Sequence, residues 1–251
     1  MQDRIDKVME ILARKGYRSV SELSQDLEVS EMTIRRYLDK LERKNLIQRT
    51  HGGAYTGQEM IEVDYRVRET VCKVEKEAIG RRAAALVRPG ESIFIDAGST
   101  TAFLAMALDD TKRLTVVTNS LVAAQALGNK SMIETFLLGG KIHEATHSLI
   151  GTFAETTVRQ FRFTKAFLGA SGVDLAEGLT QSTIDEIPIK KIVAANSQEV
   201  IVLVDSTKFG KNVLALFLGL DSVDIIVTDK GIKDTDRRTL EEQGIRMIVA
   251  E

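Results

Sequence analysis

The chain has 251 residues, of which 43% are hydrophobic and 28% are charged, and its formal net charge at pH 7 is −2. Such a composition is ordinary for a globular protein, and the length allows one large domain or two smaller ones. A single cysteine, Cys72, excludes an internal disulfide, and three histidines without a cysteine cluster argue against a zinc site, so no metal is expected. The polar amino terminus and the lack of a long apolar run predict a cytoplasmic protein with no signal peptide and no membrane span.

Residues 1–57 have the spacing of three short helices followed by two short strands. Apolar residues recur at helical spacing over 3–15, and a second helix begins at Ser19 or Ser21, either of which could cap it. A third helix is predicted over 31–44, and a β-hairpin around a Gly-Gly turn follows it. Two short helices, a tight turn and a third helix are typical of a helix-turn-helix.

Basic residues are concentrated in this segment although the whole chain is slightly acidic. Six basic residues and only two acidic ones lie between Arg35 and Arg49, and Arg36, Tyr37 and Lys40 are placed on the third helix. The alternative is a small helical packing or dimerisation domain, which needs no such density of basic side chains. The pattern therefore favours a module that binds DNA.

Three motifs in this segment, at residues 19–23, 29–38 and 49–54, resemble the winged helix-turn-helix of the DeoR family of bacterial sugar-metabolism regulators. The resemblance implies that Ser30–Lys44 binds the major groove of double-stranded operator DNA and that the wing contacts the backbone or the minor groove. The helix-turn-helix itself would occupy about residues 20–39. The residues expected to contact DNA are Ser21, Ser30, Met32, Thr33, Arg35, Arg36, Tyr37, Lys40, Arg49, His51 and Gly52.

Residues 58–90 are predicted to be a polar linker, 58–68, and a connecting helix over 69–87. Across 91–251, apolar strands alternate with helices, which predicts an α/β domain with a mostly parallel sheet covered on both faces. Strands are expected at 92–96, 114–118, 134–138, 166–169, 200–205, 224–228 and 245–249, and helices at 101–108, 121–127, 150–160, 184–195 and 235–242.

The loops after these strands are rich in glycine, hydroxyl, amide and lysine groups, at the edge where open α/β sheets bind ligands. The first strand turns through glycine into a helix start with three hydroxyl side chains, where backbone N–H groups and the helix dipole favour a phosphate. Capping or turn formation is the alternative for any one residue, but five such loops favour a phosphorylated sugar or polyol. The residues expected to bind it are Asp96, Gly98, Ser99, Thr100, Thr101, Thr118, Asn119, Ser120, Gly139, Gly140, Lys141, Gly169, Asp174 and Lys208.

The same loops resemble the effector-binding domain of the DeoR family, over Tyr65 to the carboxyl terminus. In that family the domain resembles ribose-5-phosphate isomerase and binds a phosphorylated sugar as inducer, and the resemblance adds Lys190, paired with Glu186, to the expected site. Lys141 stands where the family often has arginine. Pro188 stands where the family usually has a helix former, so the role of Lys190 holds only if the helix begins near Glu186.

Catalysis is not expected, because the isomerase carries an Asp-Gly-Ala-Asp run where this chain has Leu168-Gly169-Ala170-Ser171. No cofactor is expected either. The predicted function is that of a repressor of a sugar-metabolism operon, acting as a homo-oligomer (a dimer or a tetramer) whose operator binding is modulated by a sugar phosphate. The alternatives are an isomerase-like enzyme, and a DNA-binding scaffold whose carboxyl-terminal domain only oligomerises.

Overall fold

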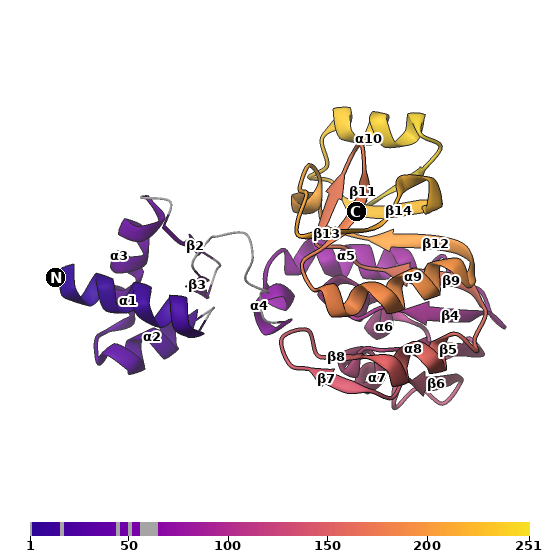
Figure 1. The fold of residues 1–251 in the computed structure, drawn as a ribbon, viewed down its shortest axis with the longest axis horizontal. Coiled ribbons are helices and arrows are strands. Elements are labelled where there is room, and N and C mark those ends of the chain that lie inside the picture. The colour runs from indigo at the N-terminus through magenta and orange to yellow at the C-terminus, as the bar shows by residue number, and fades with distance from the viewer. Residues whose placement is uncertain (1, 16–17, 44–45, 50–51, 56–64) are drawn as a thin grey trace. The chain divides into compact units, whose positions relative to one another are not determined.

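The computed structural model describes residues 2–15, 18–43, 46–49, 52–55 and 65–251, and the chain divides into two compact units, Met1–Val71 and Cys72–Glu251 (Figure 1). His51 and residues 58–64 of the predicted linker lie outside the described residues. Within the described ranges, no helix has both the length and the apolar character needed to cross a membrane.

In its described residues up to Tyr55, the first unit contains three helices and a small antiparallel sheet. The helices are α1 (Gln2–Lys15), α2 (Val20–Leu27) and α3 (Glu31–Glu42), and the strands β1 (Arg18–Ser19), β2 (Gln48–Arg49) and β3 (Gly53–Tyr55) pair in the order β1-β3-β2. The predicted hairpin is therefore confirmed as β2 and β3, with β1 as an additional strand. The core consists of Ile5, Val8, Leu12, Val20, Leu23, Ile34, Tyr37, Leu38, Leu41, Ile47 and Ala54.

The start of α2 is fixed by a capping box. Ser19 Oγ accepts a hydrogen bond from the Glu22 N–H at 3.1 Å, and Glu22 Oε2 accepts one from the Ser19 N–H at 2.8 Å. This reciprocal pair satisfies two backbone donors that the first turn of a helix would leave unpaired. Ser19 is therefore the N-cap, and Ser21 lies on the exposed side of the helix.

The prediction of one continuous helix over 69–87 is wrong. The segment contains two helices, α4 (Tyr65–Thr70) and α5 (Lys73–Ala84), and Cys72 between them has a φ of 51°. A residue in the left-handed region cannot continue a right-handed helix. Burial and the nearby Asp205 carboxylate raise the pKa of the Cys72 thiol, which keeps it protonated and unreactive at neutral pH.

The second unit is built on a seven-stranded parallel sheet, and all seven predicted strands are found in it. The sheet order is β15-β14-β12-β9-β4-β5-β6. The strands are β4 (Ser92–Ile95), β5 (Leu114–Thr118), β6 (Ile133–Leu137), β9 (Phe163–Leu168), β12 (Ser197–Leu203), β14 (Ile225–Asp229) and β15 (Arg246–Ala250). The chain runs outward from β4 to β6 and then returns to β9, beside β4, before it runs outward on the other side. The sheet order therefore reverses between β4 and β9, and a crevice forms at the carboxyl ends of strands around such a switch point.

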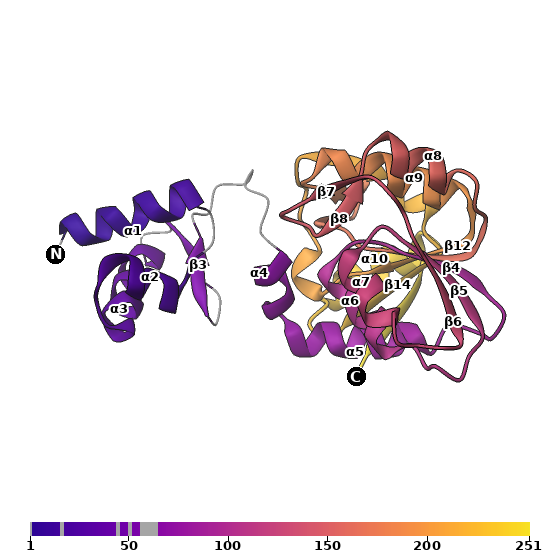
Figure 2. The same ribbon diagram turned by 90° about the horizontal axis from the view of Figure 1, so that it is seen from below.

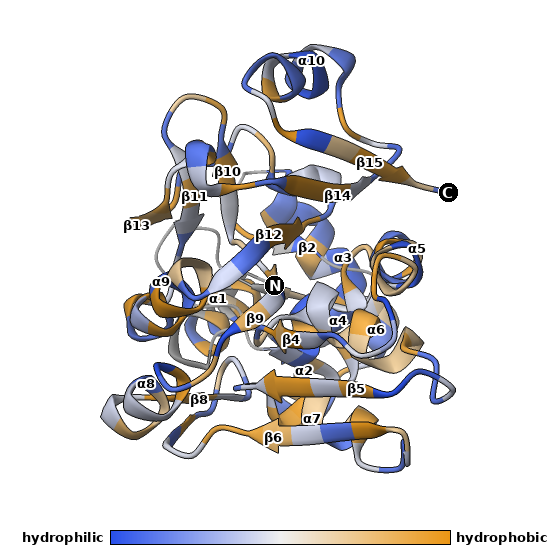
Figure 3. Cartoon of the chain, turned by 90° about the vertical axis from the view of Figure 1, so that its right-hand side faces the viewer, coloured by the Kyte–Doolittle hydropathy of each residue, from blue (hydrophilic) through white to orange (hydrophobic). Residues whose placement is uncertain are grey.

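Helices cover both faces of this sheet, as Figures 2 and 3 show. One face packs against α5, α6 (Ser99–Ala107) and α7 (Leu121–Leu127), and the other against α8 (Thr152–Val158), α9 (Ile187–Ala195) and α10 (Asp234–Glu242). Strand β4 contributes side chains to the hydrophobic cores on both faces of the sheet. Ile93 and Ile95 face the first set of helices, and Phe94 faces the second.

Several short elements lie in segments that were predicted to be loops. β7 (Lys141–His143) and β8 (Ser148–Ile150) form an antiparallel pair, and β10 (Gly172–Asp174), β11 (Gly178–Gln181) and β13 (Ala215–Leu218) form a second small antiparallel sheet. Three 3-10 turns complete the unit: η1 (Ile184–Glu186), η2 (Ser206–Lys208) and η3 (Leu220–Ser222).

Gly80 permits the close approach of α5 and α6. A Cβ atom at this position would lie 2.6 Å from the carbonyl carbon of Phe103 and 2.7 Å from its Cβ. We expect Gly80→Ala to lower the free energy of unfolding by about 1–3 kcal/mol, the usual range for overpacking, as measured by urea denaturation. The control is Gly128→Ala, where an added Cβ would lie 3.5 Å from its nearest neighbour and stability should not fall. Equal stability of the two variants would contradict this account of α5 and α6.

Candidate functional site

Helix α3 presents one apolar face to the core and one polar face to solvent. Ile34, Leu38 and Leu41 are buried, whereas Met32 is 81% exposed and the basic side chains of the helix are exposed as well. Ser30 caps the helix by accepting a hydrogen bond from the Thr33 N–H at 3.3 Å. Met32, Arg35, Arg36 and Lys40 are all exposed, and arginine and lysine are residue types that contact phosphates and base edges.

One residue of the predicted DNA surface is misplaced. Tyr37 is only 4% exposed and belongs to the core of the first unit, so its prediction as an exposed DNA contact is wrong. The wing is tied to the exposed face of α3, because Arg49 forms an ion pair with Asp39. Ser21 and Gly52 are exposed, on α2 and beside β3, and Arg35 lies 3.6 Å from Glu31 one turn earlier in α3.

In the second unit, a buried ion pair lies at the switch point between β4 and β9. Lys190 of α9 forms an ion pair with Asp96 Oδ2, and both side chains are 1% exposed. The same oxygen accepts a hydrogen bond from the Gly169 N–H at 2.9 Å, and Lys190 Nζ donates to the Gly169 carbonyl at 2.9 Å. Burial raises the pKa of Asp96, although the Lys190 ammonium opposes that shift. Pro188 lies in the first turn of α9, where proline is tolerated, so the expected helix start is confirmed.

Several predicted site residues hold the loops together through their own hydrogen bonds. Asn119 Oδ1 accepts from the Ala97 N–H at 3.0 Å, Thr118 Oγ1 donates to the Ile95 carbonyl at 2.6 Å, and Thr101 Oγ1 donates to the Asp96 carbonyl at 2.7 Å. Ser120 caps α7. The ends of β4 and β5 are therefore fixed to each other by side-chain hydrogen bonds.

The amino-terminal end of α6 has no side-chain cap. Its N-cap residue is Gly98, which has no side chain to accept the N–H groups of the first turn. Ser99 and Thr100 occupy that turn and are 6% and 7% exposed. Backbone donors, two hydroxyls and the positive end of the helix dipole suit a bound anion.

The loop that follows β12 is anchored to α5 and to the end of β14. Lys76 Nζ lies 3.9 Å from Asp205 Oδ2, and both side chains are almost fully buried. Asp205 Oδ1 also accepts from the Thr207 N–H at 3.1 Å, and Asp229 Oδ1 accepts from the Ser206 N–H at 2.6 Å. Lys208, at the end of η2, is half-buried.

The remaining predicted residues lie farther out. Gly139, Gly140 and Lys141 are exposed, and Gly140 has a φ of 143° and so little space that an added Cβ would lie 2.6 Å from the Ile150 carbonyl oxygen. Asp174 is the last residue of β10, and its carboxylate accepts from two N–H groups of the turn that leads to β11, each at 2.9 Å. Asp174 thus has a local role in the turn, whereas its place in an effector site stays a prediction.

Two family models match the chain, one in each unit. Residues 4–59 match the DeoR-like helix-turn-helix domain, and residues 72–230 match the DeoR C terminal sensor domain. The chain belongs to the DeoR family. It is therefore a transcriptional regulator with a DNA-binding helix-turn-helix and a sensor domain for a small-molecule effector, and it is not an enzyme.

Relatives in this family are similar over most of their length. The glycerol-3-phosphate regulon repressor of Escherichia coli K12 is 34% identical over 226 residues, which cover 90% of each chain. The lactose phosphotransferase system repressor of Lactococcus lactis subsp. lactis is 35% identical over 233 residues, or 91% of each chain. A solved structure of ribose 5-phosphate isomerase A from Methanocaldococcus jannaschii has 22% identity and a TM-score of 0.42, over 55% of each chain. A likeness of that degree decides nothing about the sensor site.

Three buried polar residues of this DeoR-family sensor domain were not among the predicted site residues. These residues are Lys76, Gln181 and Glu186. Gln181 Nε2 donates to Glu186 Oε2 at 2.7 Å, and Lys76 forms an ion pair with Asp205. Glu186 could have been included, because it precedes Lys190 by four residues and so shares its helical face. Lys76 could not, because it stands among other charged residues of α5 with no local feature to distinguish it.

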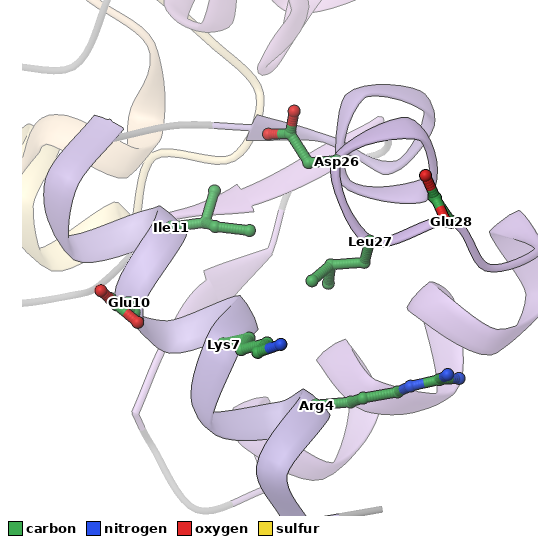
Figure 4. Close-up of a pocket in the computed structure, with 7 residues that line it drawn as sticks. All are labelled: Arg4, Lys7, Glu10, Ile11, Asp26, Leu27 and Glu28. Atoms are coloured by element: carbon green, nitrogen blue, oxygen red, sulfur yellow. The ribbon is translucent and has the colours of Figure 1, made fainter.

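Two surface grooves lie away from both predicted sites. One, of about 590 Å³, is lined from α1 and the end of α2 by Arg4, Lys7, Glu10, Ile11, Asp26, Leu27 and Glu28 (Figure 4). The other, of about 500 Å³, is lined by Ala78, Arg81, Arg82, Ala85, Val249 and Glu251. Neither groove is lined by α3 or by the loops at the carboxyl ends of the strands.

Proposed function

We propose that this protein represses a sugar-metabolism operon and that a phosphorylated sugar or polyol, bound at the carboxyl edge of the parallel sheet, weakens its operator binding. The observation that carries the proposal is the uncapped amino-terminal end of α6, which begins three residues after Asp96 of the buried ion pair. The repressors of the glycerol-3-phosphate regulon and of the lactose phosphotransferase system, at about one-third identity, support this class of regulated gene.

The phosphate of this effector binds at the start of α6. Ser99 and Thr100 supply hydroxyl donors, and the first-turn N–H groups add backbone donors. Lys208 of η2 and Lys141 at the start of β7 add positive charge. The effector acts by preferring one arrangement of the protein, because a ligand with equal affinity for both states changes no equilibrium.

The DNA-bound form is a homo-oligomer. A single winged helix buries too little surface for the affinity and specificity of a typical operator complex. Two copies related by a two-fold axis double the contacts and match a palindromic site. Sedimentation of the protein with and without a selected DNA duplex tests this, and a monomer bound to a single half-site would contradict it.

The proposal is tested by a panel of phosphorylated compounds. Thermal-shift measurements with glycerol 3-phosphate, ribose 5-phosphate, ribitol 5-phosphate, fructose 1-phosphate and glucose 6-phosphate should identify at least one that stabilises the protein. The same compound should then release the protein from a duplex selected from a randomised DNA pool. Stabilisation by none of them would favour the scaffold reading, in which the second unit only oligomerises.

The double variant Ser99→Ala/Thr100→Val should bind the stabilising compound at least about tenfold more weakly, since hydrogen bonds to a charged group contribute roughly 1.5–3 kcal/mol each. Its DNA affinity should equal that of the parent protein, because α3 is untouched. Calorimetric titration and fluorescence anisotropy measure the two affinities. The control is Ser131→Ala, an exposed serine just before β6, at the opposite edge of the sheet. Unchanged effector affinity in the double variant would place the phosphate elsewhere.

A further inference from the structure

Two buried carboxylate oxygens at the switch point have no hydrogen-bond partner. In the part of the chain that the structure describes, neither Asp96 Oδ1 nor Glu186 Oε1 meets a donor. As whole residues Asp96 and Glu186 are 0% and 1% exposed, so bulk solvent does not reach the two oxygens. Their other oxygens are occupied, because Asp96 Oδ2 binds Lys190 and the Gly169 N–H, and Glu186 Oε2 binds Gln181. Buried acceptors without donors are costly and rare, which marks this place as one that a ligand completes.

The net charge of Asp96, Glu186 and Lys190 determines which chemical group of a ligand can bind beside them. Asp96, Glu186 and Lys190 together carry one negative charge when all three are ionised. Burial raises the pKa of Asp96, Lys190 opposes that shift, and the Glu186 charge adds to it. A phosphate placed here would be repelled by both carboxylates. A neutral group with polarised hydrogens, such as a hydroxyl, would instead donate to the two open oxygens.

We infer that Asp96 and Glu186 accept hydrogen bonds from two hydroxyl groups at the non-phosphorylated end of the effector. This inference rests on the proposed function, and it specifies the orientation of the bound effector. Its anionic end lies at the uncapped start of α6, and its polyol end reaches the buried carboxylates beneath α9. The effector is therefore a polyol phosphate with at least two free hydroxyl groups.

Binding of this kind requires a local opening, since both oxygens are covered in the structure. The segment next to Glu186 that must yield is the end of β11. Gln181 is held to Ser171 by a hydrogen bond of 3.3 Å, and Ser171 Oγ also lies 3.1 Å from Ser182 Oγ. These contacts are long for hydroxyl hydrogen bonds, so exchanging them for bonds to a ligand costs little.

The test compares ribitol 5-phosphate with inorganic phosphate by calorimetric titration of the full-length protein. The parent protein should bind ribitol 5-phosphate at least tenfold more tightly than inorganic phosphate. Glu186→Gln should lose about tenfold in affinity for ribitol 5-phosphate, because a charge-assisted hydrogen bond is replaced by a neutral one, and its affinity for inorganic phosphate should not change. The matched control is Glu91→Gln, which removes another largely buried carboxylate, paired with Lys165 at the opposite edge of the sheet.

Glu186→Gln preserves shape and removes a charge from a net-negative buried group, so it should fold, and Glu186→Met is a second variant for which the same loss is expected. Equal binding of the two compounds by the parent protein would overturn the inference and leave the phosphate site intact. So would a Glu186→Gln variant whose affinities both stay the same or fall together, which is the outcome expected if a trapped proton or water fills the two oxygens. Failure of the parent protein to bind either compound would overturn this inference, whereas the proposed function would be overturned only if no compound of the five-membered panel stabilised the protein.

Discussion

Replacing Lys190 with methionine is expected to lower the free energy of unfolding by about 3–5 kcal/mol. The substitution keeps the length of the side chain but leaves the Asp96 carboxylate fully buried without its cation. It also removes the hydrogen bond to the Gly169 carbonyl and the position of the ammonium 5.3 Å from the centre of the Phe217 ring. Urea denaturation followed by circular dichroism measures the loss. The surface variant Arg237→Met, which breaks a largely exposed pair with Glu241, should lose no more than about 1 kcal/mol.

A second substitution separates the charge effect from a packing effect. Asp96→Asn added to Lys190→Met should recover much of the stability, because replacing a whole buried ion pair by neutral groups is far less costly than removing one partner. A double variant as unstable as the sum of the two single variants would show that the side chains contribute independently, and the ion-pair account would be wrong.

The loss in Lys190→Met should also depend on pH. Burial already raises the pKa of Asp96, and without the lysine nothing opposes that shift, so the folded-state pKa moves further above the unfolded value of about 3.9. A group whose folded pKa is raised takes up a proton on folding. The variant therefore becomes less stable as the pH rises from about 4 toward the folded pKa. Its deficit relative to the parent protein should be smaller at pH 5 than at pH 8.

The parallel sheet could be predicted because its strands are buried on both faces. Such strands form short apolar runs between loops, and all seven were placed within three residues of their observed bounds. Strand β13 was missed because its pairing depends on a distant partner, as in Thr180 with Leu216. The local hairpins β7–β8 and β10–β11 were missed because their strands have only three or four residues, too few for a clear alternating pattern. The break at Cys72 was missed for a similar reason. No glycine or proline marks it, and helical spacing continues on both sides.

The loops of the candidate site could be predicted because each follows a strand of a parallel sheet. Which side chains contact the ligand could not be predicted, because a threonine that binds a ligand and a threonine that holds a loop in place look the same in the sequence. Thr101 and Asn119 hold backbone groups in place. Tyr37, by contrast, could have been placed correctly, because Ile34, Tyr37, Leu38 and Leu41 follow the i, i+3, i+4, i+7 spacing of a buried helix face.

Arg36→Ala is expected to weaken operator binding by about 10- to 100-fold, or roughly 1–3 kcal/mol, if this side chain contacts a base or a phosphate. Arg36 lies on the exposed face of α3, near the 81% exposed Met32, while the opposite face of the helix holds the core. The substitution should leave stability unchanged, because no buried group depends on it. Fluorescence anisotropy with a duplex that the parent protein selects from a randomised pool measures the affinity.

Salt dependence then distinguishes the two kinds of contact. If Arg36 binds a phosphate, the slope of log K against log salt concentration should become shallower by about one, and the loss should be similar for all sequences. If Arg36 reads a base, the slope changes little and the protein loses discrimination at one position of the duplex. The control is Arg81→Ala, which removes an exposed arginine from α5 of the sensor domain and should change neither quantity. An Arg36→Ala variant that binds the selected duplex as tightly as the parent protein would mean that α3 is not the helix that enters the major groove.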